Sequence, residues 1–195
     1  REIISAFDEH GDLGMFGGTA AAATAYRYQV LRDEGAAADI VAGARADLLR
    51  AIEAFHVVLS ITGFPGGLAR GVGHQDDVNE SVYVPWPTSC PNAWERSDTW
   101  RESLDPALSD WVWRDNGSKD QLLGTALAMG AFWDAIADDP AIDASIKARL
   151  QADARALGHA LMEPVEVVPG ASLDLVIRDG TGCLTRFHDL NPREV

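Results

Sequence analysis

The stretch Asp8-Glu9-His10-Gly11-Asp12 gathers the side chains of this sequence best suited to acid–base chemistry or to holding a cation. Its carboxylates Asp8, Glu9 and Asp12 are candidate catalytic acids or bases. Asp8, His10 and Asp12 could also ligate a divalent cation such as calcium. The stretch lacks the spacing of an EF-hand loop and has a single His, so neither a calcium nor a zinc assignment is specific. The alternative interpretation is an acidic turn whose side chains bond backbone N–H groups.

A second polar stretch follows the tryptophan pair Trp111 and Trp113. The alternation of the two indoles predicts an extended segment with both rings on one face. Ser118 and Gln121 have the spacing of a capping box, which predicts that a helix starts there. Capping leaves three polar residues of this stretch to face a ligand. They are Asp115, a fourth catalytic candidate, and the binding candidates Asn116 and Lys119.

Five of the six tryptophans lie between residues 86 and 113, namely Trp86, Trp94, Trp100, Trp111 and Trp113. Indole rings in a loop can stack on sugar rings or line a groove, which makes Trp86, Trp111 and Trp113 candidate binding residues. Any single one of these rings is more often a buried apolar side chain that packs a long loop against the core.

Basic side chains near the same region supply two further binding candidates, Arg70 and His74, and Arg186 with His188 lies near the C-terminal end. Arg would clamp a carboxylate through two hydrogen bonds, and His could move protons. With this many acidic residues, internal ion pairs are the default expectation. The sequence has no Gly-x-Ser-x-Gly, phosphate-binding loop, dinucleotide fingerprint or Cys-x-x-Cys. Lipase-type acyl transfer, nucleotide binding and thiol redox chemistry are therefore not indicated.

Four helices are predicted next to these stretches, because apolar residues recur there at intervals of three and four. Their ranges are about 19–34, 37–62, 118–138 and 140–162. Thr19 is the expected N-cap of the first helix, and Gly35 is its expected end. Pro140, with Asp139 as its cap, is expected to open the fourth.

The remaining chain is expected to be loop and hairpin. Residues 63–117 have no sustained period and predict a long Trp-rich loop. Residues 165–188 alternate short β-type runs with turn signals and predict a small β-hairpin. The predicted fold class is mainly α, with antiparallel helical hairpins in a four-helix array.

Connectivity brings the polar stretches together. Short links between helices require antiparallel neighbours, so the first two helices form one hairpin and the last two another. The segments 7–18, 63–117 and 165–188 must then meet at the end of the bundle opposite the two short links. A site for a ligand is expected at that end.

Composition limits the partners. A chain of 195 residues with 47% hydrophobic residues and no break in composition predicts one domain, 1–195. The net charge of −14 argues against nucleic acid or an anionic membrane as a partner, and favours a neutral or cationic ligand. No apolar run approaches the ~20 residues that span a bilayer, so a soluble protein is expected. Its compartment stays open, with an extracytoplasmic one favoured.

Two features of the chain leave alternatives open. Cys90 and Cys183 could form one disulfide or remain two buried thiols. The start at Arg1-Glu2, without a Met, predicts a processed product or a piece of a longer chain.

Four stretches also carry a resemblance to a known architecture. They are Asp8 to Asp12 before a small-residue helix, Leu68-Ala69-Arg70 after the first hairpin, Asn116 to Gln121 at the opening of the second, and Asp179-Gly180 to Asn191-Pro192 in the tail. With them the sequence resembles bacterial proteins of the α/α-toroid kind, the six-hairpin architecture of many glycoside hydrolases, polysaccharide lyases and sugar epimerases. Two hairpins cannot close a ring of about six, so the resemblance implies a partial α/α toroid, with a stand-alone four-helix array as the alternative.

These expectations combine in a carbohydrate-active domain that acts on or binds a glycan through a Trp-lined, acidic surface at one end of the helical hairpins. A sugar would stack on the tryptophans, a carboxylate would act as acid or base, and Arg70 or Lys119 would orient the substrate. Hydrolase, lyase and epimerase chemistry stay open. The alternative is a non-catalytic or structural module that binds a glycan, a peptide or the remainder of a longer parent chain, stiffened in one version by a cation.

Overall fold

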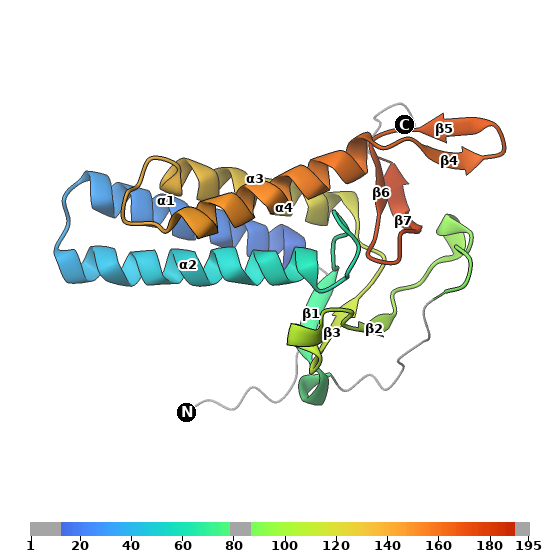
Figure 1. The fold of residues 1–195 in the computed structure, drawn as a ribbon, viewed down its shortest axis with the longest axis horizontal. Coiled ribbons are helices and arrows are strands. Elements are labelled where there is room, and N and C mark those ends of the chain that lie inside the picture. Colours follow the sequence, from blue (N-terminus) through green and yellow to red (C-terminus); the bar gives the residue numbers. More distant parts are fainter. Residues whose placement is uncertain (1–12, 79–86, 190–195) are drawn as a thin grey trace.

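The computed structural model describes residues 13–78 and 87–189, and within these ranges four long helices lie side by side (Figure 1). They are α1 (Gly18–Asp33), α2 (Ala38–Ser60), α3 (Lys119–Ile136) and α4 (Ala144–Met162). The tight connections that join α1 to α2 and α3 to α4 lie at one end of the helices, so each pair is antiparallel (Figure 1). Each helix lies within a few residues of its predicted range.

The helix ends follow local sequence in two cases and depart from it in two. Gly35, with a φ of 67°, follows the last turn of α1, and Ser118 with Gln121 forms the expected capping box of α3. Thr19 is not an N-cap, because a π-helical turn, η2 (Leu13–Gly17), runs directly into α1. Helix α4 begins later than predicted, and Asp143, not Asp139, accepts a hydrogen bond from a first-turn amide, that of Ser145.

The predicted long loop is the main error in the expected fold class. Residues 63–117 contain a three-stranded antiparallel sheet in the order β1–β3–β2. Its strands are β1 (Gly71–His74), β2 (Trp100–Glu102) and β3 (Trp111–Arg114), and short 3-10 turns flank them at η3 (Gln75–Asp77), η4 (Ala93–Glu95) and η5 (Pro106–Leu108). The fold is therefore mixed α/β, and the predicted mainly α array with a structureless loop is wrong. The extended segment predicted from the Trp111–Trp113 alternation is confirmed as β3, but strands of three or four residues are too short to show a sustained period of two, and β1 and β2 had no such signal.

The C-terminal part also differs from the single hairpin predicted over 165–188. It forms two separate two-stranded antiparallel sheets. One pairs β4 (Val165–Val168) with β5 (Ala171–Leu173), and the other pairs β6 (Val176–Arg178) with β7 (Leu184–Asp189). Leu175, between β5 and β6, has a φ of 56°, a left-handed conformation that separates the two pairs of strands.

The hydrophobic core lies among the facing sides of the four helices. Phe55 of α2 and Phe132 of α3 meet edge to face with ring centroids 5.7 Å apart. Helix α3 approaches η2 and α1 so closely that a Cβ on Gly124 would stand 2.2 Å from the carbonyl oxygen of Gly14. Only glycine fits that contact.

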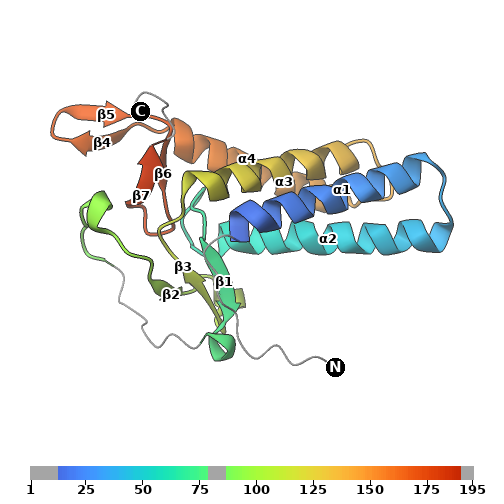
Figure 2. The same cartoon turned by 180° about the vertical axis from the view of Figure 1, so that it is seen from behind.

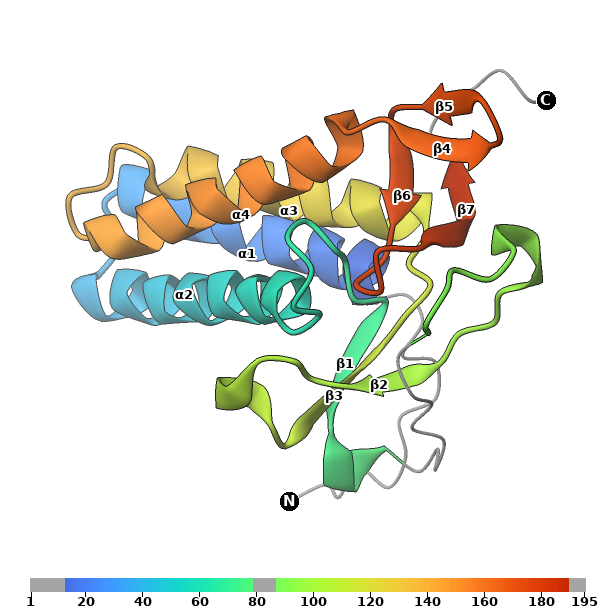
Figure 3. The same cartoon turned by 45° about the vertical axis from the view of Figure 1, so that its right-hand side comes forward.

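All three sheets gather at the end of the helices opposite the two short connections, as Figures 2 and 3 show. The sheet β1–β3–β2 and the pair β6–β7 lie beside one another there (Figure 3). Connectivity predicted this convergence. The polar residues that bind these sheets to one another are therefore the place to look for a site.

Candidate functional site

Several expected site residues lie outside the described residues. They are Asp8, Glu9, His10, Asp12 and Trp86. Their proposed roles in acid–base chemistry, in cation binding and in stacking therefore stay predictions. Among residues 13–78 and 87–189, the side chains form no group of three or more His, Cys, Asp or Glu able to hold a metal ion.

The two alternating tryptophans have different surroundings. Trp113 is fully buried in the core, and its Nε1–H donates to the carbonyl oxygen of Glu102 at 3.2 Å. Trp111 is 37% exposed and pairs edge to face with His74, its cross-strand neighbour, with ring centroids 5.9 Å apart. Trp113 is thus a core residue, whereas Trp111 and His74 form a small exposed aromatic pair at one end of the sheet.

Asp115, a catalytic candidate, lies in the interior with 1% of its surface exposed. Its Oδ2 accepts from Arg101 Nε at 2.7 Å and from Arg96 Nη2 at 3.3 Å, and its Oδ1 accepts from the Thr99 amide at 2.8 Å. Contacts to these three residues hold both carboxylate oxygens. The geometry gives Asp115 a structural role, that of fixing two arginines beneath the surface.

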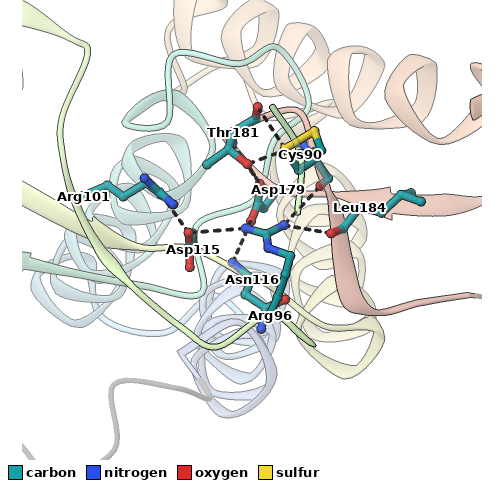
Figure 4. Close-up of a disulfide and its surroundings, with 9 residues drawn as sticks. Cys90, Arg96, Arg101, Asp115, Asn116, Asp179, Thr181 and Leu184 are labelled. Carbon is teal, nitrogen blue, oxygen red and sulfur yellow. Dashed lines mark hydrogen bonds and ion pairs between the residues drawn. A yellow bond between two sulfur atoms is a disulfide. The ribbon is translucent and has the colours of Figure 1, made fainter. Parts of the chain in front are cut away.

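Arg96 links the sheets. Its Nη2 also donates to Asp179 Oδ2 at 2.6 Å, and its Nη1 donates to the carbonyl oxygen of Leu184 at 2.8 Å (Figure 4). Asp179 is fully buried, and its Oδ1 accepts from the amide and the hydroxyl of Thr181 at 2.9 and 2.6 Å. One guanidinium thereby ties the segment before β2 to the turn between β6 and β7.

Burial and the nearby Asp179 carboxylate raise the pKa of Asp115, although Arg101 acts in the opposite direction. A carboxylate removed from water loses hydration, and a second negative charge beside it adds repulsion. The guanidinium groups of Arg96 and Arg101 are what make two such carboxylates tolerable in one interior.

A disulfide closes the same cluster. Cys90 and Cys183 are bonded, which settles the alternative between a bridge and two thiols (Figure 4). The bridge joins the segment before η4 to the residue directly before β7. It therefore lies beside the Cys183 and Leu184 carbonyl oxygens that accept hydrogen bonds from Arg96, at 3.5 and 2.8 Å.

Asn116 is the residue around which the surface above the cluster is built. It has a φ of 60° and is 2% exposed. Its amide donates to Asp179 Oδ2 at 2.8 Å, and its carbonyl oxygen accepts from Arg70 Nη1 at 3.2 Å. Its side chain donates to Asp98 Oδ1 at 3.1 Å and accepts from the Arg186 amide at 2.7 Å. Four hydrogen bonds thus hold a left-handed backbone that would otherwise be strained.

A polar pocket of about 390 Å³ opens over Asn116. We call it the arginine pocket, and it is lined by Arg70, Arg96, Ser97, Asp98, Arg114, Asn116 and Arg186. Asp98 Oδ2 lies 3.2 Å from Arg70 Nε and 3.4 Å from Arg114 Nε. These three side chains are 19 to 22% exposed, so a solute can reach them, whereas Asp115 does not line the pocket.

The structure brings together only part of the expected binding set. Arg70 and Asn116 line the arginine pocket, but His74 and Trp111 occupy the opposite end of β1 and β3. Three residues at about 3.3 Å each separate the two ends of such a strand. Lys119 is exposed at the first position of α3 and does not line the pocket.

Sequence reasoning missed four pocket residues, Arg96, Ser97, Asp98 and Arg114. Asp98 and Ser97 stand in an irregular segment with no pattern, so no local signal marks them. Arg114 directly follows the Trp111–Trp113 alternation, and its place at the end of a short strand was the available signal. Arg186 had been noted as a possible carboxylate clamp, and it does line the pocket.

A second depression is apolar. It lies between α3 and α4, with a volume of about 530 Å³, and its lining includes Leu123, Met129, Trp133, Ala154 and Leu161. Leu123 is 65% exposed there. Among the described residues, no helix has the length and apolar character needed to cross a membrane.

Fold and site together define a mixed α/β protein in which a buried arginine–aspartate cluster supports an arginine-lined pocket. Comparison with known proteins adds no relative: no family model, curated protein or solved structure matches this chain.

Proposed function

We propose that this protein binds a saccharide in the arginine pocket. The observation that carries the proposal is the mixture of donors and acceptors around one solvent-reachable cavity of about 390 Å³, a volume within the range of small-ligand sites. Arg70 and Arg114 supply N–H donors, Asp98 supplies carboxylate acceptors, and the Ser97 hydroxyl can do both. Sugar hydroxyls also act as both donor and acceptor, so such walls complement them.

Preorganisation favours this pocket over other polar surface. The bonds of Asn116 and the buried ion pairs of Arg96 fix the pocket floor before any ligand arrives. A site whose supporting residues are already ordered loses less entropy when it binds. The exposed pair of Trp111 and His74 lacks such support, and we assign it no part in the pocket.

The proposal is limited to binding. Glycoside hydrolysis uses a pair of carboxyl groups, one on each side of the scissile bond. Asp98 is the carboxylate that lines the pocket among the described residues, and Asp115 is held beneath it. A catalytic role for Asp8, Glu9 or Asp12 stays a separate hypothesis.

The test is calorimetric titration with a panel of neutral, amino and acidic mono- and disaccharides. Ser97→Trp places a bulky ring at the wall of the pocket, and we expect it to lower the affinity for every saccharide that binds by about tenfold or more. Ser109→Trp is the matched control, because Ser109 is also an exposed serine but does not line the pocket. The proposal is wrong if no saccharide binds, or if Ser97→Trp binds as the wild type does.

A further inference from the structure

The arginine pocket has a charge opposite to that of the molecule. Five arginines gather at the pocket and in the cluster beneath it, Arg70, Arg96, Arg101, Arg114 and Arg186. Among the described residues, Asp98, Asp115 and Asp179 face them. At the pocket wall, Arg70 and Arg114 share the single carboxylate of Asp98, so these three side chains carry one positive charge in excess in a chain whose net charge is −14. A local field of this kind attracts anions, whatever the overall charge.

The excess is located at the pocket wall, not in the buried cluster. Both terminal nitrogens of Arg96 are occupied, because they donate to two carboxylates and two backbone carbonyl groups. Arg114 differs, because its one acidic partner among the described residues is Asp98, which it shares with Arg70. Each guanidinium has five N–H donors, so one shared carboxylate leaves most of them for a ligand.

The contacts of Asp98 are also poorly aligned. Its Oδ2 is within ion-pair distance of the Nε atoms of Arg70 and Arg114. Neither buried Nε–H, however, has a hydrogen-bond acceptor among the described residues. Leaving such a donor without an acceptor is unfavourable, so a carboxylate that approached in better alignment would replace these contacts with stronger ones.

We propose that the saccharide bound in the arginine pocket is an acidic one, a uronic acid, whose carboxylate is received by Arg70 and Arg114 in competition with Asp98. This inference rests on the proposed function and narrows its ligand class. It also replaces the expectation of a neutral or cationic ligand, which came from net charge alone. Arg is suited to this role because its planar fork matches a carboxylate through two parallel hydrogen bonds.

The test compares glucuronate with glucose, and galacturonate with galactose, by calorimetric titration at low salt, with inorganic phosphate as a third probe. We expect each uronate to bind wild-type protein about tenfold more tightly than its neutral hexose. Arg114→Gln removes a donor to both kinds of sugar, but it should weaken uronate binding far more than hexose binding and so bring that ratio close to one. Asp98→Asn, which keeps an oxygen for Asn116 but loses the competing charge, should tighten uronate binding several-fold. Arg27→Gln, on the helical side, removes the same charge as a matched control.

The outcomes separate the two proposals. Equal binding of uronate and hexose overturns the acidic ligand and leaves saccharide binding in place. Binding of phosphate as tight as that of uronate overturns it in favour of a general anion site. Looser uronate binding in Asp98→Asn overturns the competition with Asp98. If no sugar binds at all, both proposals fail.

Discussion

Asn116 shows how much one side chain can determine at the scale of a residue. It holds a left-handed backbone, donates to and accepts from three neighbouring segments, and forms the pocket floor. Asparagine tolerates this conformation better than most residues, because its short polar side chain bonds locally. The same residue therefore forms the left-handed turn and the floor of the pocket.

Replacing Asn116 separates its two contributions. Asn116→Gly keeps the backbone conformation but loses both side-chain bonds, whereas Asn116→Ala loses the bonds and adds strain. We expect Ala to lower the free energy of unfolding by about 1–2 kcal/mol more than Gly does. Urea denaturation of the two variants measures this difference. Equal stability would show that the left-handed conformation is not retained.

Asp139 determines acid stability at the opposite end of the helices. Burial alone would raise its pKa, but hydrogen bonds from Tyr28, from the Ala141 amide and from Arg32 outweigh burial and hold that pKa below its usual value. Its stabilising contribution is therefore present above the unfolded pKa of about 3.9 and is lost as the pH falls through the folded pKa.

Asp139→Asn should lower the free energy of unfolding by about 1–3 kcal/mol at neutral pH. It should also flatten the loss of stability on acidification, since the variant has no carboxylate to protonate. Asp115 changes stability with pH in the opposite direction, because its raised pKa favours the folded state at low pH. The contribution of Asp139 is therefore measured as the difference between Asp139→Asn and the wild type, both of which contain Asp115. Denaturation curves from pH 7 to pH 3 provide the measurement, with Asp174→Asn as control, because Asp174 is exposed. Parallel pH profiles for wild type and Asp139→Asn would contradict the assignment.

At the scale of an element, α3 contains two glycines whose replacement by alanine should change the stability of the protein in opposite directions. Gly124 faces the backbone of η2, where an added Cβ would collide, whereas a Cβ on Gly130 meets nothing within 4 Å. Gly124→Ala should destabilise the protein by about 1–3 kcal/mol through overpacking. Gly130→Ala should stabilise it by about 0.5–1 kcal/mol, since alanine favours helix. Thermal unfolding of both variants is the measurement, and a stabilising Gly124→Ala would refute the close packing.

Helices could be predicted from this sequence, whereas among the short strands of residues 63–117 only β3 had a local signal, the Trp111–Trp113 alternation. The stripe of α2, with Leu48, Ile52 and Phe55 buried, repeats often enough to show a period of 3.6. Strand β3 pairs instead with partners up to 43 residues away, as Gly71 with Arg114, and its four residues contain one buried tryptophan and one exposed one. Its place in a sheet is set by those distant partners, which a local pattern does not contain.

The pocket residues divide in the same way. Asn116 stands in an Asn-Gly turn before a recognisable helix cap, so its importance could be inferred locally. Asp98 acquires its role only when β1 and β3 bring Arg70 and Arg114 to it. Asp115 was expected to face a ligand, but its arginine partners come from the unpredicted strand β2 and the segment before it.

The disulfide acts at the scale of the whole molecule. It joins residues 93 positions apart and ties the segment before η4 to the strand pair β6–β7. Removing it by reduction or by the double change Cys90→Ala with Cys183→Ala should lower the free energy of unfolding by about 2–5 kcal/mol. Thermal unfolding with and without a thiol reductant measures this. The double variant is the control, because its unfolding should not respond to reductant, and an unchanged wild-type transition would contradict the prediction.

The same bridge alters how the chain would respond to tension. Pulled from its two ends, the oxidised protein can lengthen only through residues outside the bridge, because force passes directly from Cys90 to Cys183. The 93-residue span between them, which includes β3, α3 and α4, is withheld from the contour length. At about 3.4 Å for each extended residue, this hidden length is on the order of 300 Å. Under tension, this part of the chain can therefore extend only after the disulfide has been reduced.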